Sequence, residues 1–362
     1  MSRGLGTMAC AWWLGLLATA ATAAVPAPAA QDSFRDPLDT PAAPTRLASV
    51  TQSTALARVG ERRVVAVGMR GLIIVSDDGG VTWRQVPAPV GSDLLAVRFV
   101  DARHGWAGGH DGVVLATNDG GDTWARLVDG RQAGPLLVDH FTQLAATGDP
   151  RAQRLLREVR RNFENGPEMP VLDLWFEDTQ RGWAVGPFGT AVGTVDGGRT
   201  WQSWVERVDN PNMLHYHAIR GIAGDVYMPS EQGTVFKLDR DRQRFVALQT
   251  GYAGSFFGIV GTRDFVLAYG LRGTIYRSRD RGTTWERLAT DLPATVTGAT
   301  VLDDGRVLLV TQDGRVVVTA DRGDSFQPLR PARPTLFTDA VQVAPGTAIV
   351  SGLSGVQVVP LH

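Results

Sequence analysis

The sequence predicts an all-β protein folded as a seven-bladed β-propeller, and two repeated patterns support this prediction. An eight-residue box with an aspartate, a glycine and a final aromatic residue occurs five times, as SDDGGVTW, TNDGGDTW, TVDGGRTW, SRDRGTTW and TADRGDSF. A pattern that returns about every forty residues indicates a repeat architecture. A second marker, a glycine followed by apolar residues, gives the number of units as seven: Gly71, Gly112, Gly189, Gly233, Gly273, Gly314 and Gly355.

Each unit divides into short strands separated by turn residues, as the second unit shows most clearly. Its four predicted strands cover residues 94–100, 105–110, 113–117 and 122–128, with the first innermost and the last at the rim. Four strands in about forty residues are typical of a propeller blade. The seventh unit ends after three strands. Because an open sheet edge is unfavourable, Thr45–Val50 is predicted to pair with it as an N-terminal strand that closes the ring.

The start of the chain predicts export. Arg3 precedes an apolar run from Met8 to Ala24, and small residues follow it. Residues 1–24 are therefore expected to be a secretory signal peptide, cleaved between about residues 21 and 30, which would place the chain in the periplasm. The alternative is an uncleaved N-terminal anchor, although the run is short for a membrane span. A proline-rich lead-in covers 25–44, and the propeller covers 45–362.

Composition excludes several kinds of function. The net charge of −1 gives no electrostatic argument for binding nucleic acid. Cys10, the one cysteine, lies inside the expected signal peptide. The mature chain would then have no disulfide, no thiolate metal site and no cysteine nucleophile. A monomer without cofactors is expected.

The boxes are predicted to be structural turns between the third and fourth strands of a blade. The aspartate accepts backbone N–H groups, the glycine supplies a positive φ, and the aromatic residue packs between neighbouring sheets. The calcium-binding ladder of acidic residues is missing, so no metal is expected there. The residues concerned are Asp78, Asp119, Asp196, Asp280 and Asp321, with Trp83, Trp124, Trp201, Trp285 and Phe326.

A longer interval between Trp124 and Trp201 indicates an insertion between blades 2 and 3, covering 131–170. Two short helices are expected there, capping part of one face of the ring. Asp149 is the expected N-cap of the second helix, and Pro150 is its first residue. Five arginines follow, which either solvate an exposed helix face or contact a partner: Arg151, Arg154, Arg157, Arg160 and Arg161.

The boxes match the Asp-box, or BNR, repeat, and the chain resembles the photosystem II stability and assembly factor family. The pattern VG-x-x-G-x-I-x-x-S-x-DGG-x-TW is nearly complete in Val67–Trp83. Tyr252–Val260 and Tyr269–Trp285 also resemble that family. The resemblance implies a seven-bladed propeller, exported or lumenal, that acts without enzyme activity as an assembly factor for a membrane protein complex. It allows peripheral membrane association.

The face opposite the boxes carries the variable turns and is predicted to bind the partner, since loops on a rigid scaffold commonly carry function. Arginine and aromatic residues are favoured at binding hot spots. The predicted contacts are Arg70, Arg272, Tyr252 and Phe256, followed by His110, Phe188, His215 and Tyr216.

Three other functions are weighed against this one. A sialidase-like glycoside hydrolase needs an arginine cluster, a tyrosine–glutamate nucleophile pair and an aspartate acid, which the sequence does not clearly provide. A periplasmic propeller that binds a sugar or another small ligand in its central channel is a further alternative. His215 and His217 would share one side of an extended segment, but no third metal ligand is evident.

Overall fold

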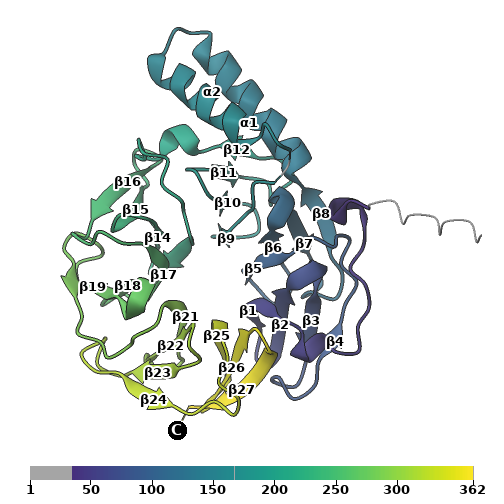
Figure 1. Ribbon diagram of the computed structural model, residues 1–362, viewed down its shortest axis with the longest axis vertical. Helices are drawn as coiled ribbons and strands as arrows, with labels where there is room; N and C mark the ends of the chain where they lie inside the picture. Colours follow the sequence, from purple (N-terminus) through teal and green to yellow (C-terminus); the bar gives the residue numbers. More distant parts are fainter. Residues whose placement is uncertain (1–34, 167, 362) are drawn as a thin grey trace, which may run out of the picture. The chain divides into compact units, whose positions relative to one another are not determined.

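Seven antiparallel sheets stand around a common centre in the computed structural model, which describes residues 35–166 and 168–361 (Figure 1). Six sheets have four strands and one has three, each in chain order. The predicted seven-bladed propeller is thereby confirmed. The predicted signal peptide and the first half of the lead-in, 25–34, lie outside the described residues. No helix in the described ranges is both long and apolar enough to cross a bilayer.

The blades follow one another along the chain. Blade 1 consists of β1 (Ser53–Val59), β2 (Arg63–Gly68), β3 (Ile73–Ser76) and β4 (Arg84–Gln85). Blade 2 consists of β5 (Leu94–Phe99), β6 (Gly105–Gly109), β7 (Val114–Thr117) and β8 (Ala125–Val128). Blade 3 consists of β9 (Asp173–Phe176), β10 (Gly182–Val185), β11 (Ala191–Thr194) and β12 (Gln202–Ser203). Blades 4 and 5 consist of β13 (Arg220–Ile222), β14 (Asp225–Pro229), β15 (Thr234–Asp239), β16 (Arg244–Gln249); β17 (Phe256–Gly261), β18 (Val266–Gly270), β19 (Ile275–Ser278) and β20 (Glu286–Arg287). Blades 6 and 7 consist of β21 (Val296–Val301), β22 (Val307–Thr311), β23 (Val316–Thr319), β24 (Gln327–Leu329); β25 (Phe337–Ala344), β26 (Thr347–Gly352) and β27 (Gly355–Pro360).

The first strand of each blade is innermost, and neighbouring first strands such as β1, β5 and β9 contact one another. Because the strands alternate in direction, the turns after the first and third strands share one face, which we call the box face. The turns after the second strands and the connections between blades lie on the opposite face, which we call the turn face. The Asp boxes therefore lie on the box face.

Each box aspartate organises its own turn. Asp280 accepts hydrogen bonds from the backbone N–H and the hydroxyl of Thr284, at 2.8 and 2.6 Å, and from the Ser278 hydroxyl at 2.8 Å. The Trp285 indole donates to the carbonyl of Gly282, which has a φ of 97°. The same pattern of aspartate contacts recurs at Asp78, Asp119, Asp196 and Asp321.

The box aromatics pack in the seams between blades. Trp124 joins a core cluster with residues of blades 1 and 2, and Trp285 one with residues of blades 4 and 5. In blade 4, where the box is degenerate, Phe245 packs with Trp183 and Trp204 of blade 3. An aromatic wedge is thus kept where the turn chemistry is lost. Burying such a ring removes on the order of 200 Å² from water.

The ring does not close through a fourth strand in blade 7, so the prediction for Thr45–Val50 is wrong. Residues Ala48–Val50 form a single 3₁₀ turn, η2, and β27 remains the last strand of its sheet. Local hydrogen bonds explain the difference: the Thr45 hydroxyl accepts from Leu47 N–H, and the Thr51 hydroxyl donates to the Leu47 carbonyl. Such side-chain contacts compete with strand pairing.

The closing seam is held at the inner strands and by the lead-in. The Thr338 hydroxyl of blade 7 donates to the Ser53 carbonyl of blade 1 at 2.9 Å, and Asp339 accepts from Leu56 N–H at 3.0 Å. Thr297 makes the equivalent bond from blade 6 to Phe337 of blade 7, at 2.7 Å. Ala48 packs in the core between blades 1 and 7. Closure thus uses the same contacts as the other seams, with η2 added.

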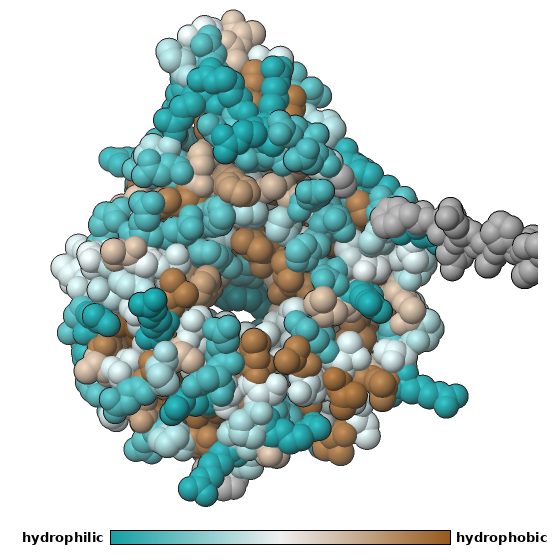
Figure 2. All heavy atoms as spheres, in the orientation of Figure 1, coloured by the Kyte–Doolittle hydropathy of each residue, from teal (hydrophilic) through white to brown (hydrophobic). Residues whose placement is uncertain are grey.

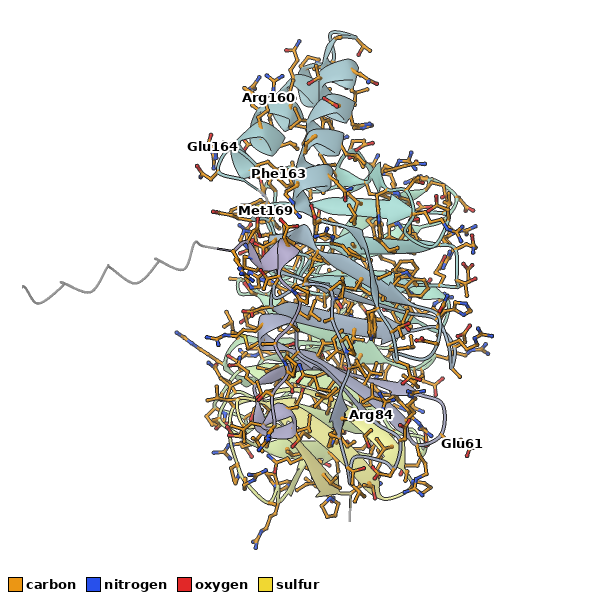
Figure 3. All side chains as sticks on the ribbon, turned by 90° about the vertical axis from the view of Figure 1, so that its right-hand side faces the viewer. Glu61, Arg84, Arg160, Phe163, Glu164 and Met169 are labelled. Atoms are coloured by element: carbon orange, nitrogen blue, oxygen red, sulfur yellow. The ribbon has the colours of Figure 1, made fainter. Side chains whose placement is uncertain are left out.

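The insertion forms a hairpin of α1 (Gly130–Ala145) and α2 (Pro150–Asn162). Asp129 and Asp149 cap the two helices, and Pro150 is the first residue of α2. Apolar residues of both helices pack together and against Val205 and Val192 of blade 3. The helical insertion is confirmed. The hairpin lies beyond β12 at the rim and extends away from the ring (Figures 1 and 3), and it meets the turn face at His110–Gly112 and at the loop after blade 3.

Candidate partner-binding face

The turn face presents side chains from unusual backbone positions. In five blades the residue before the marker glycine has a left-handed conformation, with φ of 56° at Arg70, 58° at Asp111, 51° at Phe188, 53° at Gln232 and 52° at Arg272. The following glycine is required, since a Cβ at Gly71 would lie 2.0 Å from the Val90 carbonyl oxygen. The two residues together turn the chain sharply. The side chain before the glycine is exposed at Arg70, Phe188, Gln232 and Arg272, whereas Asp111 accepts a hydrogen bond from the Ser92 hydroxyl at 2.6 Å.

The structure separates the predicted contact residues into three groups. Arg70, His110, Phe188 and Arg272 are exposed, and Tyr252 and His215 are half-buried. Tyr216 and Phe256 have no exposed surface, so neither is a surface contact and this part of the prediction is wrong. The Tyr216 hydroxyl accepts from the Asn210 amide, and Phe256 packs with Tyr252 and Tyr276. Arg70 and Arg272 belong to blades 1 and 5, so the ring distributes the predicted contacts rather than clustering them.

An aromatic row, of which only Phe188 and His215 were predicted as contacts from the sequence, crosses blades 3 to 5 on the turn face. It consists of Phe188, His215, His217 and Phe257, with successive ring centroids 4.6, 6.3 and 4.9 Å apart. None of the four is fully buried. His217 and Phe257 alternate with the buried Tyr216 and Phe256, so strand alternation was the signal that could have identified them.

His217 is fixed in its orientation and protonation. Its Nδ1 lies 2.9 Å from the carbonyl oxygen of Phe256, so Nδ1 carries the proton and donates. Burial lowers the pKa of His217, against the opposing charge of Glu231. The imidazole is therefore neutral at pH 7 and leaves Nε2 as an acceptor. Within the described ranges, no group of three or more metal-ligating side chains exists.

A groove of about 430 Å³ adjoins the row where α2 meets the loop after blade 3. Arg154, Glu158 and Arg161 of α2 line one side, and Phe188, Pro211 and Met213 line the other. The Arg161 side chain is 72% exposed, and its guanidinium lies 3.9 Å from the Glu158 carboxylate, at the outer limit of an ion pair. Phe188 is 44% exposed. The groove thus combines available guanidinium groups with an exposed aromatic ring.

The central channel contains a charged cluster centred on Asp173, in which the buried Nε of Arg98 has no hydrogen-bond partner among the described residues. Asp173 pairs with Arg98 at 3.2 Å and with Arg220, and it accepts from Ile219 N–H at 2.8 Å. Burial raises the pKa of Asp173 to about 6, against the pull of Arg98. The channel pocket holds about 300 Å³, and the opening at the centre of the ring is visible in Figure 2. The cluster links blades 2, 3 and 4.

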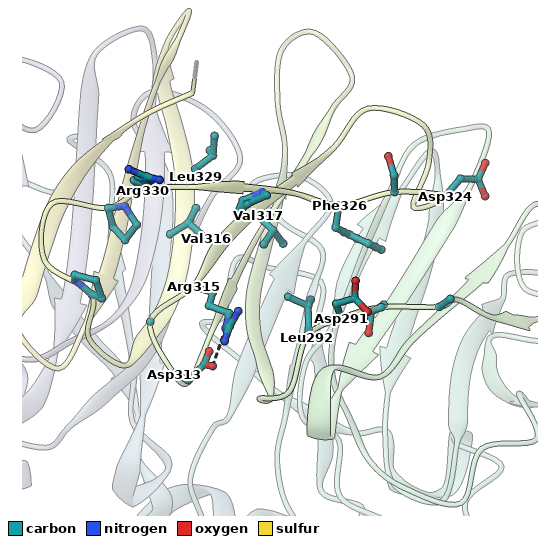
Figure 4. A pocket seen from close by; sticks show the side chains of 17 residues that line it. Asp291, Leu292, Asp313, Arg315, Val316, Val317, Asp324, Phe326, Leu329 and Arg330 are labelled. Atoms are coloured by element: carbon teal, nitrogen blue, oxygen red, sulfur yellow. Dashed lines mark hydrogen bonds and ion pairs between the residues drawn. The ribbon is translucent and has the colours of Figure 1, made fainter.

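A hollow of about 870 Å³ lies at the rim between blades 5 and 6 (Figure 4). Three of its charged residues are engaged in ion pairs: Asp313 pairs with Arg315 at 2.9 Å, and Asp324 pairs with Arg277 at 2.7 Å. None of the predicted contact residues lines it. Size alone therefore does not make it the functional site.

Comparisons with known proteins agree with this architecture. Residues 75–132 match the family model described as photosynthesis system II assembly factor YCF48. No curated protein matches the chain. A solved structure of YCF48 bound to D1 peptide is similar with a TM-score of 0.63 and 16% identity, covering 87% of this chain and 94% of that one.

Two further solved structures show the same fold. YCF48 from Cyanidioschyzon merolae has a TM-score of 0.61 and 13% identity over 88% of this chain and 97% of that one. The extracellular domain of a putative one-component system from B. thetaiotaomicron has a TM-score of 0.62 and 10% identity over 85% of this chain and 38% of that one. The resemblance to YCF48-like propellers predicted from the sequence is thereby confirmed.

Proposed function

We propose that this chain is a noncatalytic, exported β-propeller that binds a protein partner through its turn face and assists the assembly of a membrane-associated complex. The observation that carries the proposal is the choice of residues at the left-handed turn positions. A left-handed conformation costs an ordinary residue roughly 1–2 kcal/mol, which glycine does not incur. Arg70, Phe188 and Arg272 occupy such positions with exposed side chains.

These residues strain the backbone at the left-handed positions, but their side chains are well suited to a binding interface. Glycine or asparagine would satisfy the turn with less strain. Arginine and aromatic residues are enriched at interfaces and their hot spots. We infer that the side chains are retained for what they contact. The similarity to a YCF48 described as bound to D1 peptide supports a peptide or protein as the partner.

The experiment compares capture of a partner from detergent-solubilised membranes of the source cell. Arg70→Glu with Arg272→Glu is expected to abolish capture that the unchanged protein shows, with no change in thermal unfolding. The matched control reverses two exposed arginines of the box face, Arg181→Glu with Arg242→Glu, whose side chains are 57% and 73% exposed. Equal loss of capture in both double variants, or in neither, would contradict the proposal.

The noncatalytic part of the proposal has its own test. A fluorogenic sialoside is expected to remain unhydrolysed by the purified protein. Turnover that scales with protein concentration and disappears with Arg98→Ala in the channel would favour the glycoside hydrolase alternative instead.

A further inference from the structure

We infer that the groove between α2 and blade 3, together with the aromatic row, binds an extended acidic segment of the protein partner. The acidic residues of that segment would lie along α2, and its apolar or aromatic residues would lie over the row. This inference rests on the proposed function and names the chemistry of the partner.

The positive charge of α2 favours acidic residues at one end of the partner segment. The helix carries five arginines and one glutamate, a net charge of +4, in a chain whose net charge is −1. All five arginines are exposed. Arg154 is held at the groove by a hydrogen bond that it donates to the Pro211 carbonyl. Arg161 lies about two helical turns further along α2. The two groove arginines outnumber Glu158, the one acidic residue in the groove lining, so a carboxylate there would gain charge-assisted hydrogen bonds from their guanidinium groups.

The aromatic row determines which residues bind at the other end of the partner segment. From Phe188 to Phe257 the ring spacings of 4.6, 6.3 and 4.9 Å allow about five residues of an extended chain, at ~3.3 Å per residue. Glu231, whose carboxylate accepts from His215 N–H at 2.9 Å, lies beside the row. Its charge would repel acidic side chains here, so the segment is oriented with its acidic residues toward α2.

A lipid surface suits the same arginines less well. A helix that lies in a membrane interface needs an apolar face open to the lipid. The apolar stripe of α2, Ala152, Leu155 and Val159, is buried against α1 and blade 3. The helix therefore offers only its charged side, and the adjoining Phe188 sits in a concave groove rather than on a protruding edge.

The test uses the purified full-length mature protein and a fluorescein-labelled peptide with an acidic first half and two phenylalanines in its second half. Fluorescence anisotropy measures binding. Arg161→Glu is expected to weaken binding by about tenfold, because it replaces an attractive charge by a repulsive one. Phe188→Ala is also expected to weaken binding by about tenfold, through loss of an aromatic contact.

The matched control is the neighbouring residue on the same helix. Arg160→Glu makes the same change of charge, but Arg160 contacts Thr142 of α1, 3.4 Å away, instead of lining the groove. It is expected to change the affinity by less than about twofold, as a screened charge outside the contact does. Circular dichroism of all three variants checks that the fold is kept.

Three results would overturn the inference. One is equal weakening by Arg160→Glu and Arg161→Glu. Another is undiminished binding of a peptide whose acidic residues are replaced by lysine. The third is binding to phosphatidylglycerol vesicles, but not to the peptide, in a manner that Arg161→Glu abolishes. If partner capture still depends on Arg70 and Arg272 in these cases, the proposed function stands and only the groove assignment fails.

Discussion

The box aspartates and the left-handed turn residues have opposite effects on the backbone. The box aspartates satisfy the backbone around them, whereas the left-handed turn residues of the opposite face strain it, as Arg281 and Arg322 do within their own boxes. Arg70 lies between these demands, since its backbone N–H donates to Asp93 at 2.6 Å while its side chain remains exposed. Strain retained at an exposed position indicates selection for contact rather than for stability.

Replacement of Arg70 and Arg272 by glycine separates these two demands. We expect the double variant to gain about 0.5–1 kcal/mol of stability per site, because the relief of left-handed strain exceeds the added freedom of the unfolded chain. Partner capture should be lost. Replacement by alanine should lose capture without this gain, because alanine keeps the strain. Urea unfolding measures both, and destabilisation by glycine would contradict the argument.

Protonation of the box aspartates should weaken the fold in acid. Hydrogen bonds from Thr284 lower the pKa of Asp280 to about 2, and those from Ser325 lower the pKa of Asp321 to about 2. A folded-state pKa below the unfolded value of about 3.9 contributes stability above pH 4, which is lost as the pH falls toward 2. The urea midpoint should therefore fall across this window. Asp280→Asn should flatten that fall, and an unchanged pH profile would refute this origin of acid sensitivity.

Elements were predicted best where a local pattern has one structural solution. The boxes fixed the turns, and Asp149-Pro150 fixed the start of α2. Phe256 and Tyr216 were assigned to the surface wrongly because a shift of one residue reverses the side on which a strand residue lies. Their neighbours Phe257, His215 and His217 are the ones at the surface. The groove at Arg161 could not be predicted either, since the side of the ring on which the hairpin packs depends on Val205 and Val192, far along the chain.

The hairpin depends unequally on its two N-caps. Asp129 is 4% exposed, caps α1, takes part in a capping box with Gln132 and pairs with Arg131 at 3.0 Å. Asp149 caps α2 from an exposed position. Asp129→Ala should cost about 2 kcal/mol and Asp149→Ala about 0.5–1 kcal/mol, because burial adds to the loss of the cap. Chemical denaturation compares the two, and a larger cost for Asp149→Ala would contradict the assignment.

The whole ring depends on the segment that precedes the first strand, although not through strand pairing. Leu38 is buried in the core of blades 1 and 2, and Ala48 is buried between blades 1 and 7. Removal of residues before Thr54 should lower the free energy of unfolding by about 2–4 kcal/mol, from the apolar surface that becomes exposed. Removal of residues before Asp36 is the control and should have little effect. Equal melting of the two truncations would show that the segment does not hold the ring.

The central claim is that one face of the ring meets the partner and the opposite face does not. Photo-crosslinking in intact cells tests it most directly, with benzoylphenylalanine placed at Phe188 on the turn face or at Val81 on the box face, both exposed. We predict one crosslinked protein from position 188 and none from position 81. Crosslinks from position 81 alone, or the same crosslink from both positions, would contradict the claim.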